Sequence, residues 1–313
     1  MKKILLAVSA LSAAMFSTAA NADISVSGSA NAVYVDAEGN SEGHIGGVIS
    51  FAMSTTTDGG ITISASGSLS NDTDGAGTAA VGTGLTALTF GFANGTITVA
   101  DDVSVANGTG LVGELVTHAD SNQVTHTNDV AINVDDGSGI SGSTTIGDMT
   151  LAASHFYDGG HNNNISGGTI TGSGVSLTVP IGTASLVVSS SETDENGSNY
   201  ASAGGALTVA AGGGTLSLGI ETTSNDAAGV ATEGEAYSAS YSTSLGGASV
   251  AIGYTGFDAQ SNTSSKTDVT VSQSIGGGAS IFAEMSSLTG AGAAAPSANN
   301  SESVIAIGTS VSF

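Results

Sequence analysis

The feature that most constrains this chain is a period-two alternation of apolar and polar residues that recurs almost throughout. In residues 24–30 apolar side chains occupy every second position, and further along Ile45, Ile49 and Met53 would share one face. Successive side chains of a β-strand point to opposite faces, so this period is typical of strands with one apolar face. Helix signals are nearly absent after residue 22. The alternation therefore predicts an all-β protein.

Two kinds of connection separate the alternating segments and follow one another in turn. Short turns rich in glycine, the residue that hairpin turns favour, lie at 58–60, 94–95, 147–148, 181–183, 211–213, 246–247 and 276–278. Longer, polar and acidic connections lie at 36–43, 70–83, 101–139, 158–171, 192–198, 224–234, 258–266 and 288–301. This series implies about 16 strands of about 10 residues, the length that crosses a bilayer. We therefore predict a transmembrane antiparallel β-barrel with short periplasmic turns and long external loops.

Three acidic residues fall inside the predicted strands rather than in the connections. Glu221, Asp268 and Glu284 each have the parity opposite to that of their apolar neighbours. A charge that faces lipid is costly, whereas a charge in the polar interior of a barrel is tolerated. We therefore expect these carboxylates to face the lumen.

Aromatic residues fall near the predicted strand ends, where membrane barrels carry interfacial girdles. Those beside the long connections are Tyr34, Phe156, Tyr157, Tyr200, Tyr254 and Phe257, and those beside the short turns are Phe90, Phe92 and Phe313. Aromatic residues make up only 4% of the chain and Trp is absent, so the predicted girdles are sparse.

Residues 1–22 differ from the remainder of the chain. Lys2 and Lys3 precede a short apolar run, and residues 20–22 form a small-x-small pattern. This arrangement is typical of a secretory signal peptide, so we expect export and a mature domain of residues 23–313. The apolar run is too short for a membrane-spanning helix.

The charge balance is strongly acidic, with 27 Asp and Glu against 3 Lys and Arg. Loss of Lys2 and Lys3 with the signal peptide would change the net charge from -24 to -26. Such a chain has almost nothing with which to neutralise phosphates, which argues against nucleic-acid binding. No serine-nucleophile elbow or phosphate-binding loop occurs in a strand–turn–helix context. We therefore expect that the protein is not an enzyme.

Two stretches carry a family resemblance. The chain ends in an alternating strand, residues 305–313, whose Val311 and terminal Phe313 resemble the assembly signal of Gram-negative outer-membrane proteins. Residues 90–102 resemble the hairpin that leads into the third loop of 16-stranded general porins, especially the alphaproteobacterial type. The resemblance implies a homotrimer in the cell outer membrane, made by the barrel-assembly machinery and in contact with lipopolysaccharide. It also implies a passive channel for small hydrophilic solutes and ions, without a cofactor.

In that family the third loop folds into the barrel and narrows the pore, which would apply here to residues 101–139. The acidic residues of this stretch would then line the constriction: Asp101, Asp102, Glu114, Asp120, Asp129, Asp135 and Asp136. The arginines that usually face such acids are missing, because the chain has no Arg. Carboxylates without an opposing cation would favour cations. An ordinary solvated loop is the alternative interpretation.

Metal binding has weaker support. Residues 72–74, 135–136 and 192–195 offer carboxylates that Ca²⁺ accepts, but none has the spacing of an EF-hand loop. No metal ligands are therefore assigned. The rival function is a secreted acidic surface protein, such as an adhesin, a surface-layer subunit or a β-solenoid. A calcium-binding solenoid should show a short glycine–aspartate repeat, and none is present.

Overall fold

The structure is a computed structural model that describes residues 23–37, 40–72, 80–103, 115, 137–158, 170–195, 197–225, 232–259, 262–290 and 301–313. Within these residues the elements are all strands: β1 (Asp23–Ala37), β2 (Asn40–Thr56), β3 (Thr62–Asp72), β4 (Ala80–Phe92), β5 (Gly95–Val103), β6 (Gly137–Ile146), β7 (Met149–Asp158), β8 (Ile170–Ile181), β9 (Ala184–Glu195), β10 (Ser198–Ala211), β11 (Gly214–Asn225), β12 (Thr232–Leu245), β13 (Ala248–Ala259), β14 (Asn262–Gly276), β15 (Ala279–Gly290) and β16 (Ser301–Ser312).

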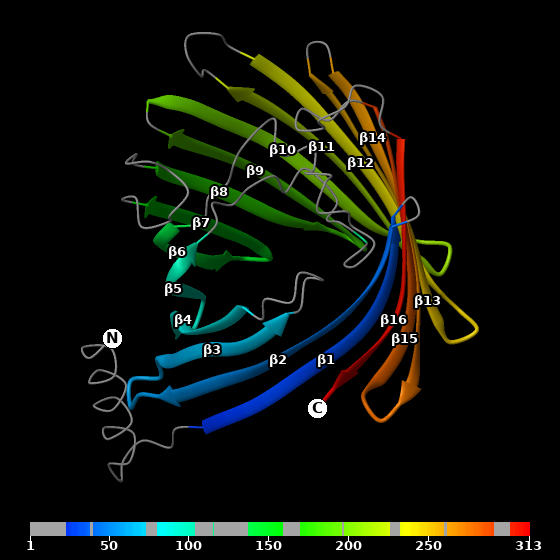
Figure 1. Ribbon diagram of the computed structural model, residues 1–313. Helices are drawn as coiled ribbons and strands as arrows, with labels where there is room; N and C mark the ends of the chain where they lie inside the picture. Colours follow the sequence, from blue (N-terminus) through cyan, green and yellow to red (C-terminus); the bar gives the residue numbers. More distant parts are fainter. Residues whose placement is uncertain are drawn as a thin grey trace.

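Each strand pairs antiparallel with its neighbours in the sequence, and β1 pairs with β16, so the sheet closes into a barrel (Figure 1). At the closure, Gly28 and Phe313 exchange two backbone hydrogen bonds of 2.9 and 3.0 Å. Closure leaves no unpaired sheet edge, which is what a sheet in lipid requires. The predicted all-β barrel is confirmed.

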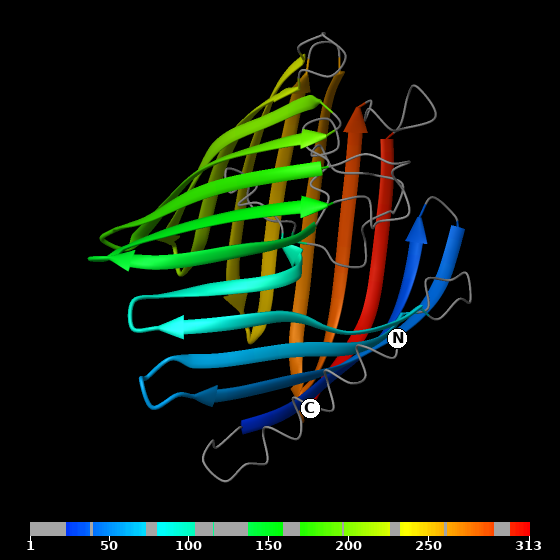
Figure 2. The ribbon, with the colours of Figure 1, turned by 90° about the vertical axis from the view of Figure 1, so that its left-hand side faces the viewer.

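The connections alternate between the two ends of the barrel, and the tight turns gather at one end (Figure 2). Most strands of the structure are longer than the predicted 10 residues, and their lengths range from 9 in β5 to 17 in β2. As a result β1 and β2 extend into the stretch predicted as the first long connection, and only residues 38–39 separate them.

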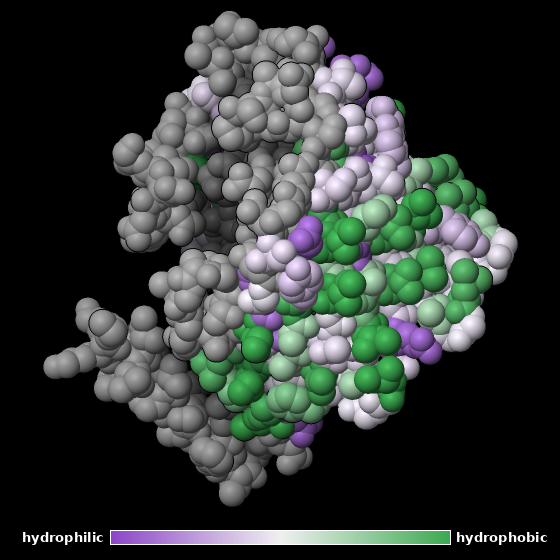
Figure 3. Space-filling view, turned by 45° about the vertical axis from the view of Figure 1, so that its right-hand side comes forward, coloured by the Kyte–Doolittle hydropathy of each residue, from purple (hydrophilic) through white to green (hydrophobic). Residues whose placement is uncertain are grey.

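The two faces of the strands differ sharply in chemistry. Within each strand, the large apolar side chains that remain exposed occupy alternate positions and so lie on one face of the sheet. Among them, Ile45, Ile220, Ile252 and Ile307 are 51–69% exposed. Apolar side chains gather on the outer face visible in Figure 3. A band of apolar side chains on the outside of a closed barrel is the surface that lipid covers. Among the described residues, no helix is long and apolar enough to cross a membrane.

Candidate functional site: the lumen wall

The inner face of the barrel carries small hydroxyl side chains that bond to each other across neighbouring strands. Ser191 and Ser202 lie 3.0 Å apart, Thr208 and Ser217 lie 3.1 Å apart, and further pairs join Thr89 to Thr98, Thr96 to Ser143 and Ser280 to Ser310. Cross-strand partners share a face, so these pairs define the lumen wall. Short hydroxyl side chains make this wall polar without filling the interior.

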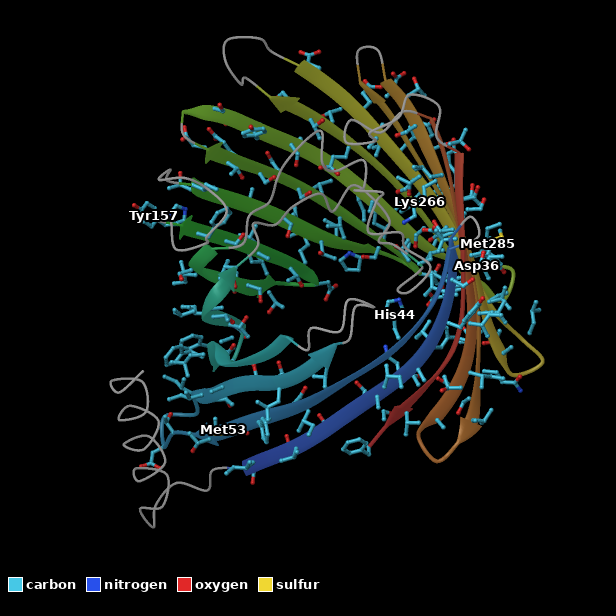
Figure 4. The ribbon with its side chains drawn as sticks, viewed as in Figure 1. Asp36, His44, Met53, Tyr157, Lys266 and Met285 are labelled. Carbon is cyan, nitrogen blue, oxygen red and sulfur yellow. The ribbon has the colours of Figure 1, made fainter. Side chains whose placement is uncertain are left out.

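The lumen face also carries buried charges. Glu221, Lys266, Asp268 and Glu284 are only 4–9% exposed, and each lies on the parity opposite to the exposed apolar residues. The structure therefore places the three acids named from the sequence on the inner side of β11, β14 and β15. Figure 4 shows Lys266 and His44 pointing into the barrel, whereas Tyr157 and Met285 point away from it.

Lys266 and Asp268 lie two residues apart on β14 and therefore share a face. The Lys266 Nζ atom is 3.9 Å from Asp268 Oδ1, with both side chains less than one-tenth exposed. Glu284 is the next acid on this wall, opposite Thr270 of β14 and Ala306 of β16. Among the buried charged residues described on the lumen face, one Lys thus stands against three acids.

Leu115 shows where part of the third connection lies. A Cβ atom built on Gly253 would come within 2.7 Å of Leu115 Cδ1, so this side chain rests directly on Gly253 in β13. Gly253 pairs with Ser240 and with Asp268, both on the lumen face. The Leu115 side chain therefore lies inside the barrel, against the wall beside Asp268.

An apolar cluster lies inside the barrel at the start of the same connection. Val103, Phe156 and Ile170 are 4%, 0% and 1% exposed and pack together with Ala100. The pairing of β5 with β6 shifts register between Ala100 and Val103, and this bulge brings both residues to the inner face. The cluster fixes the point at which the chain leaves β5.

This cluster corrects the prediction that Phe156 belongs to an interfacial girdle, because its ring points inward and is fully buried. Tyr200 also lies on the inner face, paired with Thr193. Tyr34, Tyr157 and Tyr254 lie on the outer face and are 41–53% exposed. Phe92 and Phe313 also lie on the outer face and are 46% and 75% exposed. Phe90 shares that outer parity through its pairing with Ile97, and the side chain of Phe257 lies outside the described part.

A second apolar cluster lies on the inner side of the β1–β16 seam. Val33, Val304 and Ala306 are at most 5% exposed, and Phe282 packs against them. The environment of Ala306 is therefore apolar. Val311 and Phe313, which the resemblance assigns to an assembly signal, lie on the outer face, where the Phe313 ring covers Gly28.

The predicted constriction acids fall largely outside the described residues. Asp101 and Asp102 lie in β5, within the bulged step, but their side chains are not described. Glu114, Asp120, Asp129, Asp135 and Asp136 lie outside the described residues altogether. Within the described ranges no group of three or more His, Asp or Glu side chains could hold a metal ion.

The sequence predicts small Ser and Thr side chains along the lumen, but it assigns no site role to Lys266 and does not identify which hydroxyls pair. The lumen position of Lys266 could have been predicted from its spacing to Asp268. Residues two apart in a strand share a face, whatever the exact ends of β14. The hydroxyl pairs could not have been predicted, because they depend on the register between strands.

Comparison with known proteins agrees with this architecture. Residues 7–306 match the sequence profile of a family described as Gram-negative porin. An anion-selective porin from Comamonas acidovorans superposes with a TM-score of 0.72 at 14% identity, covering 94% of this chain and 100% of that one. A loop-deletion mutant of OmpT, an outer membrane protein of Vibrio cholerae, gives a TM-score of 0.70 at 8% identity, over 93% and 99% of the two chains.

A mutant of the Rh. blastica porin gives 0.61 at 16% identity, over 93% of this chain and 100% of that one. No curated protein sequence matches the chain significantly. The closed barrel and the profile match do not favour the secreted surface protein considered above. The chain therefore belongs to the family of Gram-negative porins of the outer membrane.

Proposed function

We propose that this protein is a water-filled pore through which small hydrophilic solutes and ions diffuse passively across the outer membrane. The observation that carries the proposal is the lumen wall, which is lined by paired Ser and Thr hydroxyls inside a closed barrel of 16 strands. Barrels of this strand number leave an aqueous channel. Transport down a gradient needs no cofactor and no catalytic residue.

The pore prefers cations in this proposal. Three buried acids and one buried Lys are described on the lumen face, and Lys266 is already paired with Asp268. Negative wall charge raises the local concentration of cations and lowers that of anions. The similar Comamonas porin is described as anion-selective, so the sign of selectivity does not follow from the fold and has to come from the wall charges.

The third connection folds into the lumen in this proposal and brings its carboxylates to the constriction. Its support is the contact of Leu115 with Gly253 and the inward cluster of Val103, Phe156 and Ile170 where the connection begins. Asp101 and Asp102 are the acids nearest to that starting point. They would add to the negative charge of the wall.

The proposal also includes export through the signal peptide of residues 1–22 and assembly by the barrel-assembly machinery. The assembled protein would contact lipopolysaccharide and form a homotrimer. Their support is the sequence pattern and the family membership. Outer-membrane fractionation and the mobility of the unheated protein on gels would test them.

Planar-bilayer recording tests the pore itself. The purified protein should insert in steps of ohmic conductance, and a KCl gradient should give a reversal potential of the sign expected for K⁺ permeation. Silence in repeated reconstitutions of the folded protein would overturn the pore, and a reversal potential of the opposite sign would overturn cation preference.

Replacement of both Asp101 and Asp102 with Asn tests the third connection. The reversal potential should shift toward zero, because two negative charges leave the constriction while side-chain size is kept. The matched control is Asp148→Asn in the turn at residues 147–148, at the other end of the barrel. An equal shift in both variants would place the filter elsewhere.

A further inference from the structure

Glu221 occupies an unusual place on the lumen wall. It lies on the inner face of β11 and is only 4% exposed. Its cross-strand partners are Gly204 of β10 and Ala236 of β12, so no polar side chain lies directly beside it. The carboxylate is therefore bordered by the smallest side chains available, and these neighbours supply its oxygens with no polar partner.

Hydroxyl groups occupy the positions around this carboxylate. Ser202 and Ser238 lie diagonally on the two neighbouring strands, and Thr223 lies two residues along β11 on the same face. Diagonal neighbours across antiparallel strands are about 7–8 Å apart at Cα, within reach of a shared small ligand. All three are buried, with exposures of 5–8%. We refer to Glu221, Ser202, Thr223 and Ser238 as the Glu221 site.

The hydrogen bonds of Ser202 show how the site is polarised. Its hydroxyl bonds to the Glu221 carboxylate and lies 3.0 Å from the Ser191 hydroxyl. A hydroxyl has one hydrogen, so if Ser202 donates to Glu221 it must accept from Ser191. Thr223 donates its hydrogen to the Gly234 carbonyl at 3.4 Å, which leaves its oxygen lone pairs available. Ser202 and Thr223 thus each keep an oxygen lone pair with which a cation can be contacted.

One oxygen of Glu221 remains unmatched. Its Oε2 atom is inaccessible to solvent and has no hydrogen-bond partner within the described part of the chain. A buried carboxylate is costly unless an opposite charge or hydrogen bonds compensate it. Lys266 lies on β14, three strands away in the sheet and so about 14 Å across it, and it is paired with Asp268. A cation held by the site would supply the missing partner.

We propose that the Glu221 site binds a partly dehydrated monovalent alkali cation on the lumen wall. One carboxylate and three hydroxyl oxygens provide a single negative charge and hard oxygen ligands. Ca²⁺ sites generally use several carboxylates and other oxygens, so this set suits Na⁺, K⁺ or Rb⁺ better. The inference deepens the proposed cation preference and rests on it: the site is a place where a permeating cation pauses. Passage requires such binding to be weak.

Crystals of the folded protein soaked in RbCl test the site directly. An anomalous difference peak should lie against Glu221 Oε2 in the wild type and be absent in Glu221→Gln, which keeps the side-chain shape. The matched control is Glu235→Gln, because Glu235 lies one strand away on the outer face and is exposed. It should keep the peak. No peak in the wild type, or a peak that survives Glu221→Gln, overturns the site.

Conductance gives a second measurement. Wild-type conductance should saturate as RbCl rises, and Glu221→Gln should need about tenfold more salt to reach half-saturation, because the one charged ligand is lost. Ser202→Ala, which removes a neutral ligand, should produce a smaller shift in the same direction. Unshifted half-saturation in Glu221→Gln overturns the role of the site in permeation.

The two proposals fail in distinguishable ways. A wild-type pore that conducts and prefers cations, but shows no Rb⁺ peak at Glu221, removes the site and leaves the pore function standing. A protein that never conducts removes the pore function, while the Rb⁺ peak still decides whether the site exists. A peak for Sr²⁺ without one for Rb⁺ overturns the monovalent assignment.

Discussion

Leu115 packs against Gly253, so a substitution at Gly253 tests where this part of the third connection lies. A Cβ atom at this position would lie 2.7 Å from Leu115 Cδ1, so any side chain here competes for the space that Leu115 fills. Gly253→Val should displace Leu115 from the wall and increase single-channel conductance. Leu115→Ala should relieve the clash, so the double variant should show less than the sum of the two effects. Additive conductance changes would mean that the two residues are not coupled.

Phe156 and Tyr157 are adjacent aromatic residues with opposite roles. The Phe156 ring is fully buried inside the barrel, against Gly139 and Gly172, whereas Tyr157 is 53% exposed outside. Phe156→Ala should lower the free energy of unfolding by about 3–5 kcal/mol, because it leaves a cavity in a packed cluster. Tyr157→Ala should cost much less. Urea unfolding in lipid vesicles measures both, and equal losses would contradict the inward packing.

The same pair of residues shows what the sequence could not decide. Both lie where a strand meets a long connection, so both fit an interfacial girdle by position. The parity of β7 puts Phe156 on the face opposite to Met149 and Tyr157, and Gly139 and Gly172 give its ring space. The sequence does not mark its partner Val103, which reaches the inner face only through the bulge in β5. A bulge changes which face a residue occupies without a clear mark in the local pattern.

At the scale of elements, the hairpin turns differ in how closely they touch the remainder of the barrel. Gly60 and Gly278 have nearly the same positive φ, 80° and 79°, but a Cβ on Gly60 would meet nothing within 4 Å. A Cβ on Gly278 would clash with the backbone carbonyl oxygen of Ser312, near the end of β16. The turn between β14 and β15 is therefore packed against the final strand.

This difference predicts unequal costs for the same substitution. Gly60→Ala should lower the free energy of unfolding by about 1–2 kcal/mol, the cost of a left-handed backbone for a residue with a Cβ atom. Gly278→Ala should add to that the loss of the hydrogen bond of 2.9 Å from the Ser312 amide to the Gly278 carbonyl, since β16 has to shift. The midpoint of heat-induced mobility change on gels compares the two variants, and equal midpoints would refute the contact.

Strand number and sidedness were within reach of the sequence, whereas strand length was not. The alternation of short turns and longer connections predicted about 16 strands, and 16 are present among the described residues. The parity of Glu221, Asp268 and Glu284 predicted the side on which each lies. The first long connection was overestimated because residues 36–43 are polar and acidic, yet most of them pair in β1 and β2. Polar alternation continues a strand as well as apolar alternation does once hydrogen bonds to a neighbour are available.

For the whole molecule, the barrel separates two environments by side-chain parity alone. Apolar residues such as Ile252 are exposed on the outer face. The preceding residue of the strand, Ala251, pairs with Ser242 and Thr270 on the lumen wall. The acidic chain can tolerate its charge in a membrane because its described strand acids near mid-strand face inward. The same segregation allows the lumen charge to set ion preference without destabilising the outer face.

A pair of lysine substitutions tests that segregation. Ile252→Lys places a cation in lipid near the middle of β13 and should lower the free energy of unfolding in vesicles by about 2–4 kcal/mol. Ala251→Lys places the same charge one residue away on the lumen wall, where water and Asp268 can accommodate it, and should cost far less. It should also move the reversal potential toward zero, because it offsets part of the negative wall, while Ile252→Lys should leave the potential of the folded pore unchanged. Comparable destabilisation by both variants, or a shift in potential from Ile252→Lys alone, would mean that the two faces of β13 are reversed from the structure.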